Sequence, residues 1–193
     1  MKQFIIISLI GLSVFSSCKK DEVVNLSDQE KSDLLFLREE EKLARDVYLF
    51  SYSKYNESIF SNISNSEQSH MNSVLNLLNK YDLSDPVTNN DIGVFSNVEL
   101  QTLYNELIEI SDSSLTHALK VGATIEDLDI NDINNNIIHT TNSDLLNVYD
   151  KLNCGSRNHM RSFVGELGTY SPIYISQSDY DVIISSANEK CGK

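Results

Sequence analysis

Four long stretches of this chain repeat apolar residues at intervals of three and four and contain no proline. That spacing places the apolar side chains on one face of an α-helix, where they can pack against other helices. The whole chain has only 2 Pro and 7 Gly among 193 residues, which argues against a turn-rich all-β fold. We therefore predict an all-α fold, a four-helix bundle with short extra helices in the crossovers.

Capping residues and turns set the expected helix bounds. Ser27 and Glu30 form a capping box that opens a first helix running to about residue 55. A second box, Ser96 and Glu99, is expected to start another helix. The helices predicted after the first span residues 59–81, 96–110, 115–128, 131–139 and 142–167.

The C-terminal part changes character after Gly168. Residues 170–175 are expected to be extended, and Ser178 is expected to cap a last short helix. We therefore assign residues 28–169 to the bundle and residues 170–193 to a C-terminal tail.

The N-terminus has the three-part pattern of a secretory signal, which we assign to residues 1–17. Its apolar run is shorter than the roughly 20 residues that span a membrane. Small serines followed by Cys18 resemble the lipobox of bacterial lipoproteins, which implies that Cys18 carries a lipid. A plain secretory signal with an incidental cysteine is the alternative. Residues 18–27 are expected to form a tether.

The lipobox resemblance implies a protein of the cell envelope, anchored to a bacterial membrane. The short run Lys19-Lys20-Asp21-Glu22 resembles a tag for the outer surface. Cys154 and Cys191 would then lie in an oxidising compartment, where a disulfide is permitted but not required.

The charge is strongly negative, with 28 acidic against 15 basic residues and a formal net charge of −13. Nucleic-acid phosphates are bound by Lys and Arg surfaces, so this balance argues against a nucleic-acid partner. It suits metal cations or basic partners.

Acidic residues interrupt the apolar stripe of the first helix. Glu41 occupies a core position on it, while Glu40 lies on an adjoining stripe and is the alternative. The remaining charged residues of this segment are expected to form the opposite, solvated face: Arg38, Glu39, Lys42, Arg45 and Asp46.

The other long helices carry inward polar residues as well. Glu67 and His70 lie three residues apart on one face, and Glu126 and Asp129 take successive inward positions. The alternatives are that Asp129 and its acidic neighbours end the helix in a loop, that the spacing of Glu67 and His70 arises by chance, and that His159 is an ordinary hydrogen-bonded core residue. The complete set of candidate metal ligands is Glu41, Glu67, His70, Glu126, Asp129 and His159.

Burying four carboxylates without compensation would cost several kcal/mol for each ion. Neither Lys nor Arg lies on these stripes to neutralise them. Carboxylate-rich bundles with two histidines hold pairs of metal ions, so we predict two iron ions, with manganese as the alternative.

Two of these segments resemble the ferritin-like superfamily of dinuclear-metal bundles. Residues 41–49 are similar to its first-helix pattern, which favours Glu41 over Glu40. Residues 66–71 resemble its second-helix ExxH motif, which implies that Glu67 bridges two metals and His70 binds one.

The mature domain is also similar, over roughly residues 34–175, to a prokaryotic ferritin-like family of unknown function. The matching segments are residues 38–48, 62–70, 99–104, 118–130 and 155–163. The chain departs from the superfamily where a second ExxH is usual, because it has Ser156 three residues before His159. Asp129 is our candidate to replace the missing carboxylate.

A metal pair of this kind suggests an oxidase-type redox function, with oxygen or peroxide as the partner, such as ferroxidase or peroxide-consuming activity. Tyr48 and Tyr149 lie one or two turns from ligands and are candidates for hydrogen bonds to them. The alternatives are a non-catalytic lipoprotein that binds metal or a partner, and a structural bundle with an empty site. The sequence leaves the oligomeric state open.

Overall fold

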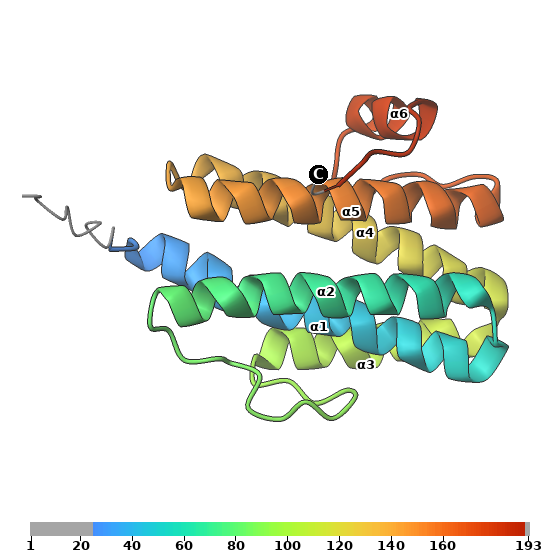
Figure 1. Cartoon of the computed structure of the whole chain (residues 1–193). Coiled ribbons are helices and arrows are strands. Elements are labelled where there is room, and N and C mark those ends of the chain that lie inside the picture. Colours follow the sequence, from blue (N-terminus) through green and yellow to red (C-terminus); the bar gives the residue numbers. More distant parts are fainter. Residues whose placement is uncertain (1–24, 192–193) are drawn as a thin grey trace, which may run out of the picture.

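The computed structural model describes residues 25–191, and within that range the chain forms six helices and no strands (Figure 1). The helices are α1 (Asp28–Tyr55), α2 (Ser58–Lys80), α3 (Val98–Ser113), α4 (Leu115–Ile138), α5 (Ser143–Leu167) and α6 (Gln177–Ser185). The all-helical prediction is confirmed. The predicted signal sequence, Cys18 and most of the tether lie outside the described residues. None of the six helices is both long and apolar enough to cross a membrane.

Four of the helices surround a common interior. α1 packs along α2 and α4 packs along α5, and the two pairs meet where α1 contacts α4 and α2 contacts α5. The helices therefore follow one another around the interior in the order α1, α2, α5, α4. α3 lies against α1 and α4, and α6 lies against α5, above it in Figure 1.

The capping box that opens α1 is confirmed. The backbone N–H of Glu30 donates to Ser27 Oγ at 3.2 Å, and the N–H of Ser27 donates to Glu30 Oε2 at 2.7 Å. Asn142 caps α5 by accepting from the N–H of Asp144 at 2.9 Å. Both ends are thus held by side chains that satisfy free amides of the first turn.

Two predicted caps are wrong by one or two residues. α3 is capped by Asn97 rather than Ser96, because the amide of Ser96 donates to Glu39 and its hydroxyl donates to a loop carbonyl. α6 is capped by Ser176, two residues before the predicted Ser178. In each case a neighbouring residue with the same capping chemistry performs the role.

α4 is continuous where the sequence predicted a helix end at residue 128 and a separate helix over 131–139. The acidic run does not end the helix, because Asp127 is buried and its carboxylate accepts several hydrogen bonds from the tail. The amides of Ile173 and Ile175 donate to it at 2.6 and 3.0 Å, and Tyr170 Oη donates at 2.9 Å. Residues 170–175 form irregular structure against α4 and no strand.

α1 has no solvated face along its middle, and this overturns a prediction. The five residues expected in solvent are all buried: Arg38, Glu39, Lys42, Arg45 and Asp46. The connection between α2 and α3, residues 81–97, supplies partners for four of them, while Arg45 donates to Asp46 and to Gln68 of α2.

Each of these charges has a specific partner. Lys42 Nζ lies 2.5 Å from Asp46 Oδ2 and donates to the carbonyl of Asp91 at 2.8 Å. Glu39 accepts from the amides at the start of α3, at 2.6 Å from Ser96 and 3.0 Å from Asn97. Buried charges are tolerated when they are paired and hydrogen-bonded in this way.

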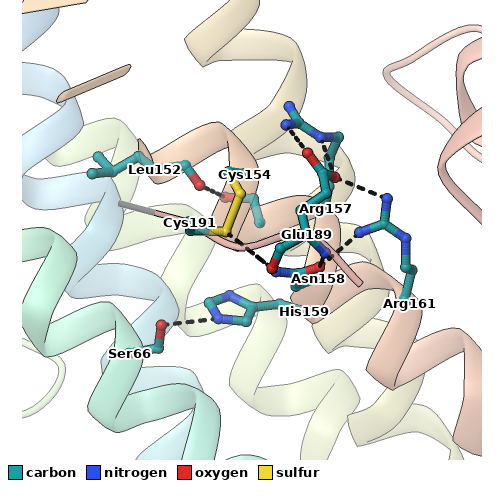
Figure 2. Close-up of a disulfide and its surroundings, with 10 residues drawn as sticks. Ser66, Leu152, Cys154, Arg157, Asn158, His159, Arg161, Glu189 and Cys191 are labelled. Carbon is teal, nitrogen blue, oxygen red and sulfur yellow. Dashed lines mark hydrogen bonds and ion pairs between the residues drawn. A yellow bond between two sulfur atoms is a disulfide. The ribbon is translucent and has the colours of Figure 1, made fainter. Parts of the chain in front are cut away.

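The C-terminal tail is fastened to α5 by a disulfide between Cys154 and Cys191, which the sequence left open. Figure 2 shows that the segment before Cys191 is held as well. Arg157 donates to both oxygens of Glu189, and Arg161 donates to Oε1 at 2.9 Å. These guanidinium contacts lower the pKa of Glu189 to about 2.

We expect Gly122→Ala to destabilise the fold. A methyl group at position 122 would lie 2.5 Å from the ring of Phe163, in the middle of the core. Overpacking of this kind costs about 1–3 kcal/mol. Gly165→Ala on α5 is the matched control, since nothing lies within 4 Å of its added methyl group and alanine favours helix by up to about 1 kcal/mol. Denaturant unfolding checks both, and an unchanged midpoint for Gly122→Ala would contradict the expectation.

Candidate metal centre

Five of the six predicted ligands come together in the interior, from all four surrounding helices. They form two groups, each with ligand atoms within 4.8 Å of one another. The first group, from α1 and α2, is Glu41, Glu67 and His70; the second, from α2, α4 and α5, is Glu67, Glu126 and His159. Glu67 belongs to both groups.

Glu67 lies between the two histidines. Its Oε2 is 2.8 Å from Nδ1 of His70, and its Oε1 is 2.7 Å from Nδ1 of His159. A second carboxylate approaches the same Nδ1 atom of each imidazole. Glu41 Oε2 lies 3.1 Å from His70 Nδ1, and Glu126 Oε2 lies 3.4 Å from His159 Nδ1. Each half therefore has one histidine, one carboxylate of its own and a share of Glu67.

The polar atoms of this cluster are buried but poorly satisfied. Glu41, Glu67 and Glu126 are 0% exposed. Among residues 25–191, neither oxygen of Glu67 has a hydrogen-bond partner, and neither does Nδ1 of His159, although the two residues approach to 2.7 Å. Buried polar atoms in folded proteins normally have a partner. Close approach without a hydrogen bond is the arrangement expected of ligands that face a shared cation.

The cluster shifts the pKa values of its members strongly. Burial raises the pKa of Glu41 to about 8, against the opposing effect of His70. Burial likewise raises the pKa of Glu126. Burial also acts to raise the pKa of Glu67, but the imidazoles of His159 and His70 outweigh this effect and lower the pKa. Burial acts to lower the pKa of His159, and Glu67 and Glu126 outweigh it to raise the value to about 10.

Asp129, the sixth predicted ligand, lies beside the cluster and belongs to neither group. It is 1% exposed, and both of its oxygens lack a hydrogen-bond partner. Burial raises its pKa well above the ordinary value, and the nearby carboxylates, Glu40 first among them, add to this. Glu40 is also buried and outside both groups.

Three further residues support the cluster. Ser66 Oγ lies 3.0 Å from Nε2 of His159, an outer hydrogen bond that leaves Nδ1 facing Glu67 (Figure 2). Tyr48 Oη donates to Glu126 Oε1 at 2.6 Å, whereas the buried hydroxyl of Tyr149 has no partner. Sequence reasoning singled out Tyr48 but missed Ser66, although Ser66 directly precedes the ExxH motif.

Gly155 is the third supporting residue, and its role depends on its lack of a side chain. A methyl group there would lie 2.6 Å from both Cε1 and Nε2 of His70. The glycine therefore makes room for the imidazole. No pattern in the sequence could indicate this, because the contact is made between α5 and α2.

A cavity of about 370 Å³ lies over the two histidines, between α2 and α5. His70 and His159 line it, together with hydroxyl groups from α2 and with Lys151 and Asn158 from α5. The fastened tail contributes Glu189 and Cys191 to its wall. Small polar molecules can thus approach the imidazole side of the cluster.

Residues 30–187 match the family described as "Uncharacterized protein domain (DUF2202)". The chain belongs to the DUF2202 family. The match begins near the start of α1 and ends just beyond α6, so all the residues of the cluster fall within it.

A relative and a solved structure are each similar to most of this chain. The chain is 51% identical over 183 residues to "Uncharacterized protein MJ0754" of Methanocaldococcus jannaschii, covering 93% of this chain and 97% of the relative. The crystal structure of hypothetical protein MJ0754 is similar with a TM-score of 0.84 and 54% identity. That similarity covers 85% of this chain and 96% of the crystallised chain.

Proposed function

We propose that this DUF2202 protein is a ferritin-like four-helix bundle that holds two metal ions, iron or manganese, for redox chemistry. α1, α2, α4 and α5 are the four principal helices. The observation that carries the proposal is the position of Glu67, which lies within 2.8 Å of one histidine and 2.7 Å of the other. A carboxylate shared between two histidine-carboxylate groups is the donor set of a dinuclear centre.

Glu41 and His70 would hold one ion, Glu126 and His159 would hold the other, and Glu67 would bridge them. The contact between Glu41 and His70 supports Glu41 as the ligand in preference to Glu40. Ser156 contributes no ligand, because its hydroxyl donates to the carbonyl of Leu152 at 3.1 Å. Asp129, which the sequence suggested as a replacement for that carboxylate, lies outside both groups and is not assigned to the centre.

A bound pair of iron or manganese ions would supply electron exchange with oxygen or peroxide. The chain positions its own groups for such a reaction. Ser66 holds the ring of His159, Tyr48 donates a hydrogen bond to Glu126, and the cavity between α2 and α5 admits small reactants. Ferroxidase or peroxide-consuming activity would use this access.

The proposal includes a lipid anchor at Cys18 and a place in the cell envelope, on the basis of the sequence alone. The membrane, the metal ions and oxygen or peroxide are then the expected partners. The second candidate function is metal or partner binding without turnover, and Ser156 favours it because that position offers no carboxylate.

Metal analysis of the full chain, purified without chelators, tests the proposal. We expect at least two iron or manganese ions per chain, because Glu67 is shared while Glu41 and Glu126 each belong to one group. Consumption of oxygen with ferrous iron, or of peroxide, would then identify the redox function. Bound metal without either activity would identify the binding protein, and metal-free protein that cannot be loaded would overturn both.

Gly155→Ala is expected to weaken one metal position and spare the other. The added methyl group would displace the ring of His70, 2.6 Å away, while His159 lies 3.8 Å away. Misplaced supporting groups weaken metal affinity by about 10–100-fold. Calorimetric titration with Mn²⁺ should show one weakened site and one unchanged site. Gly165→Ala on the same helix should leave both unchanged, and equal weakening of both sites by Gly155→Ala would contradict this assignment.

A further inference from the structure

A second group of carboxylates lies next to the candidate centre, between α1 and α4. On α4, Asp129 lies three residues after Glu126 and three before Asp132, so it neighbours both of them on the helix surface. Glu126 belongs to the centre, and Asp132 lines a cavity of about 200 Å³. Glu40 approaches this row from α1, where Asp132 and Asp129 are its neighbours.

Within the described part of the chain, no basic or amide donor pairs with the buried carboxylates of Glu40 and Asp129. Each is 1% exposed, and neither oxygen of either carboxylate has a hydrogen bond. The charged groups that act on them are all carboxylates: Asp132 and Glu41 on Glu40, and Glu40, Glu41, Glu126 and Glu67 on Asp129. A buried charge in such surroundings is strongly unfavourable unless a positive group compensates it.

Other buried acids of the same two helices show that this is unusual here. Glu39 on α1 uses both oxygens to accept amides at 2.6 and 3.0 Å. Asp127 on α4 likewise uses both oxygens, which accept amides of the tail. The chain therefore satisfies its structural carboxylates, and the pair formed by Glu40 and Asp129 stands apart from them.

We propose that Glu40, Asp129 and Asp132 bind a third divalent cation between α1 and α4, beside the cavity that Asp132 lines. Their oxygens are less tightly gathered than the two groups of the centre, whose atoms lie within 4.8 Å. A site built from carboxylate oxygens alone suits a hard cation that keeps part of its water, such as Mn²⁺ or Fe²⁺.

We infer that the third site lies between solvent and the centre, because Asp132 lines the cavity and Asp129 neighbours Glu126 of the centre on α4. The cavity is lined by Ser32, Asp33 and Phe36 of α1 and by Asp132, Asn135 and Asn136 of α4. It opens on the α1–α4 side, opposite the cavity over the histidines on the α2–α5 side. A cation entering here would meet Asp132, then Glu40 and Asp129, then the centre. This passage rests on the proposed dinuclear function, whereas the third site itself does not.

Titration of the chelator-treated full chain with Mn²⁺, with free Mn²⁺ counted by electron paramagnetic resonance, tests the site. We expect three ions for the natural protein and two for both Glu40→Gln and Asp132→Asn. Glu109→Gln, which removes an exposed acid of α3, should keep three. Asp132 is only partly buried, so its variant should fold, as circular dichroism can verify.

The outcomes separate the two proposals. Two ions in the natural protein, or three in both carboxylate variants, would overturn the third site and leave the dinuclear centre standing. No bound ion in the natural protein would overturn both. For the passage, Asp132→Asn should fill the two-ion centre at least about tenfold more slowly, as loss of electrostatic guidance predicts, with the final two ions unchanged. An unchanged loading rate would overturn the passage.

Discussion

Glu67→Gln is expected to abolish the binding of both metal ions, whereas Glu41→Gln and Glu126→Gln should each lose one. Glu67 approaches both histidines, while Glu41 approaches only His70 and Glu126 only His159. Outer residues of metal sites already contribute about 10–100-fold to affinity, so losing a shared ligand should weaken each position by more than about 100-fold. Metal content after dialysis measures this difference.

The glutamine variants keep the volume of the side chain, so we do not expect a folding defect to cause their loss of metal. Glu109→Gln changes the net charge equally and lies on the exposed side of α3, so it should keep both ions. If Glu67→Gln retained one ion while Glu126→Gln lost both, the bridging role would belong to Glu126 instead.

Without metal, the protein should lose stability as the pH rises from about 5 to 10. The pKa of Glu41 is about 8 in the fold against an ordinary 4.5, so the folded state holds a proton that the unfolded state has released. The pKa of His159 is about 10 in the fold against an ordinary 6.5, so this residue holds its proton over a higher pH range. Each such proton lowers the free energy of unfolding by up to about 1.4 kcal/mol per pH unit within its window.

For Glu67 and for the metal-loaded protein, stability changes with pH in the opposite direction. The pKa of Glu67 is lowered, so its contribution is present above about 4.5 and disappears in acid. Bound metal requires ionised carboxylates and neutral imidazoles, so its stabilisation grows as the pH rises. Denaturant unfolding at pH 5, 7 and 9, with chelator or with Mn²⁺, should give opposite slopes. Equal stability of the chelated protein at pH 5 and pH 9 would show that these groups are not buried together.

The helical periodicity was sufficient to predict an all-helical chain and the start of α1 at its capping box. It failed where tertiary partners decide the local structure. The acidic run around Asp127 looks like a helix end, but amides from residues 173–175, far along the chain, satisfy that carboxylate and let α4 continue. The charged side of α1 looks solvated for the same reason, since its partners lie in the α2–α3 connection.

In the candidate site too, the helical period predicts some residues and contacts between helices decide the others. Residues at inward positions of the helical stripes, such as Glu67 and His159, could be found from spacing because burial follows the helical period. Spacing alone could not decide whether Glu40 or Glu41 is the ligand. Adjacent residues point in different directions, and only the packing of the helices decides which of them meets His70. Gly155 makes its contact with a residue of another helix, so the helical period of the sequence does not reveal it.

The burial of Lys42 and Asp46 in α1 bears on how the protein responds to dissolved salt. Mobile ions screen charges at the surface within about 10 Å at 0.1 M, but they reach buried pairs much less. Both side chains are 0% exposed, so the attachment of the α2–α3 connection to α1 should hold equally in dilute and concentrated buffer. In a chain with a formal net charge of −13, ionic strength will then alter encounters with other molecules and leave this internal contact unchanged.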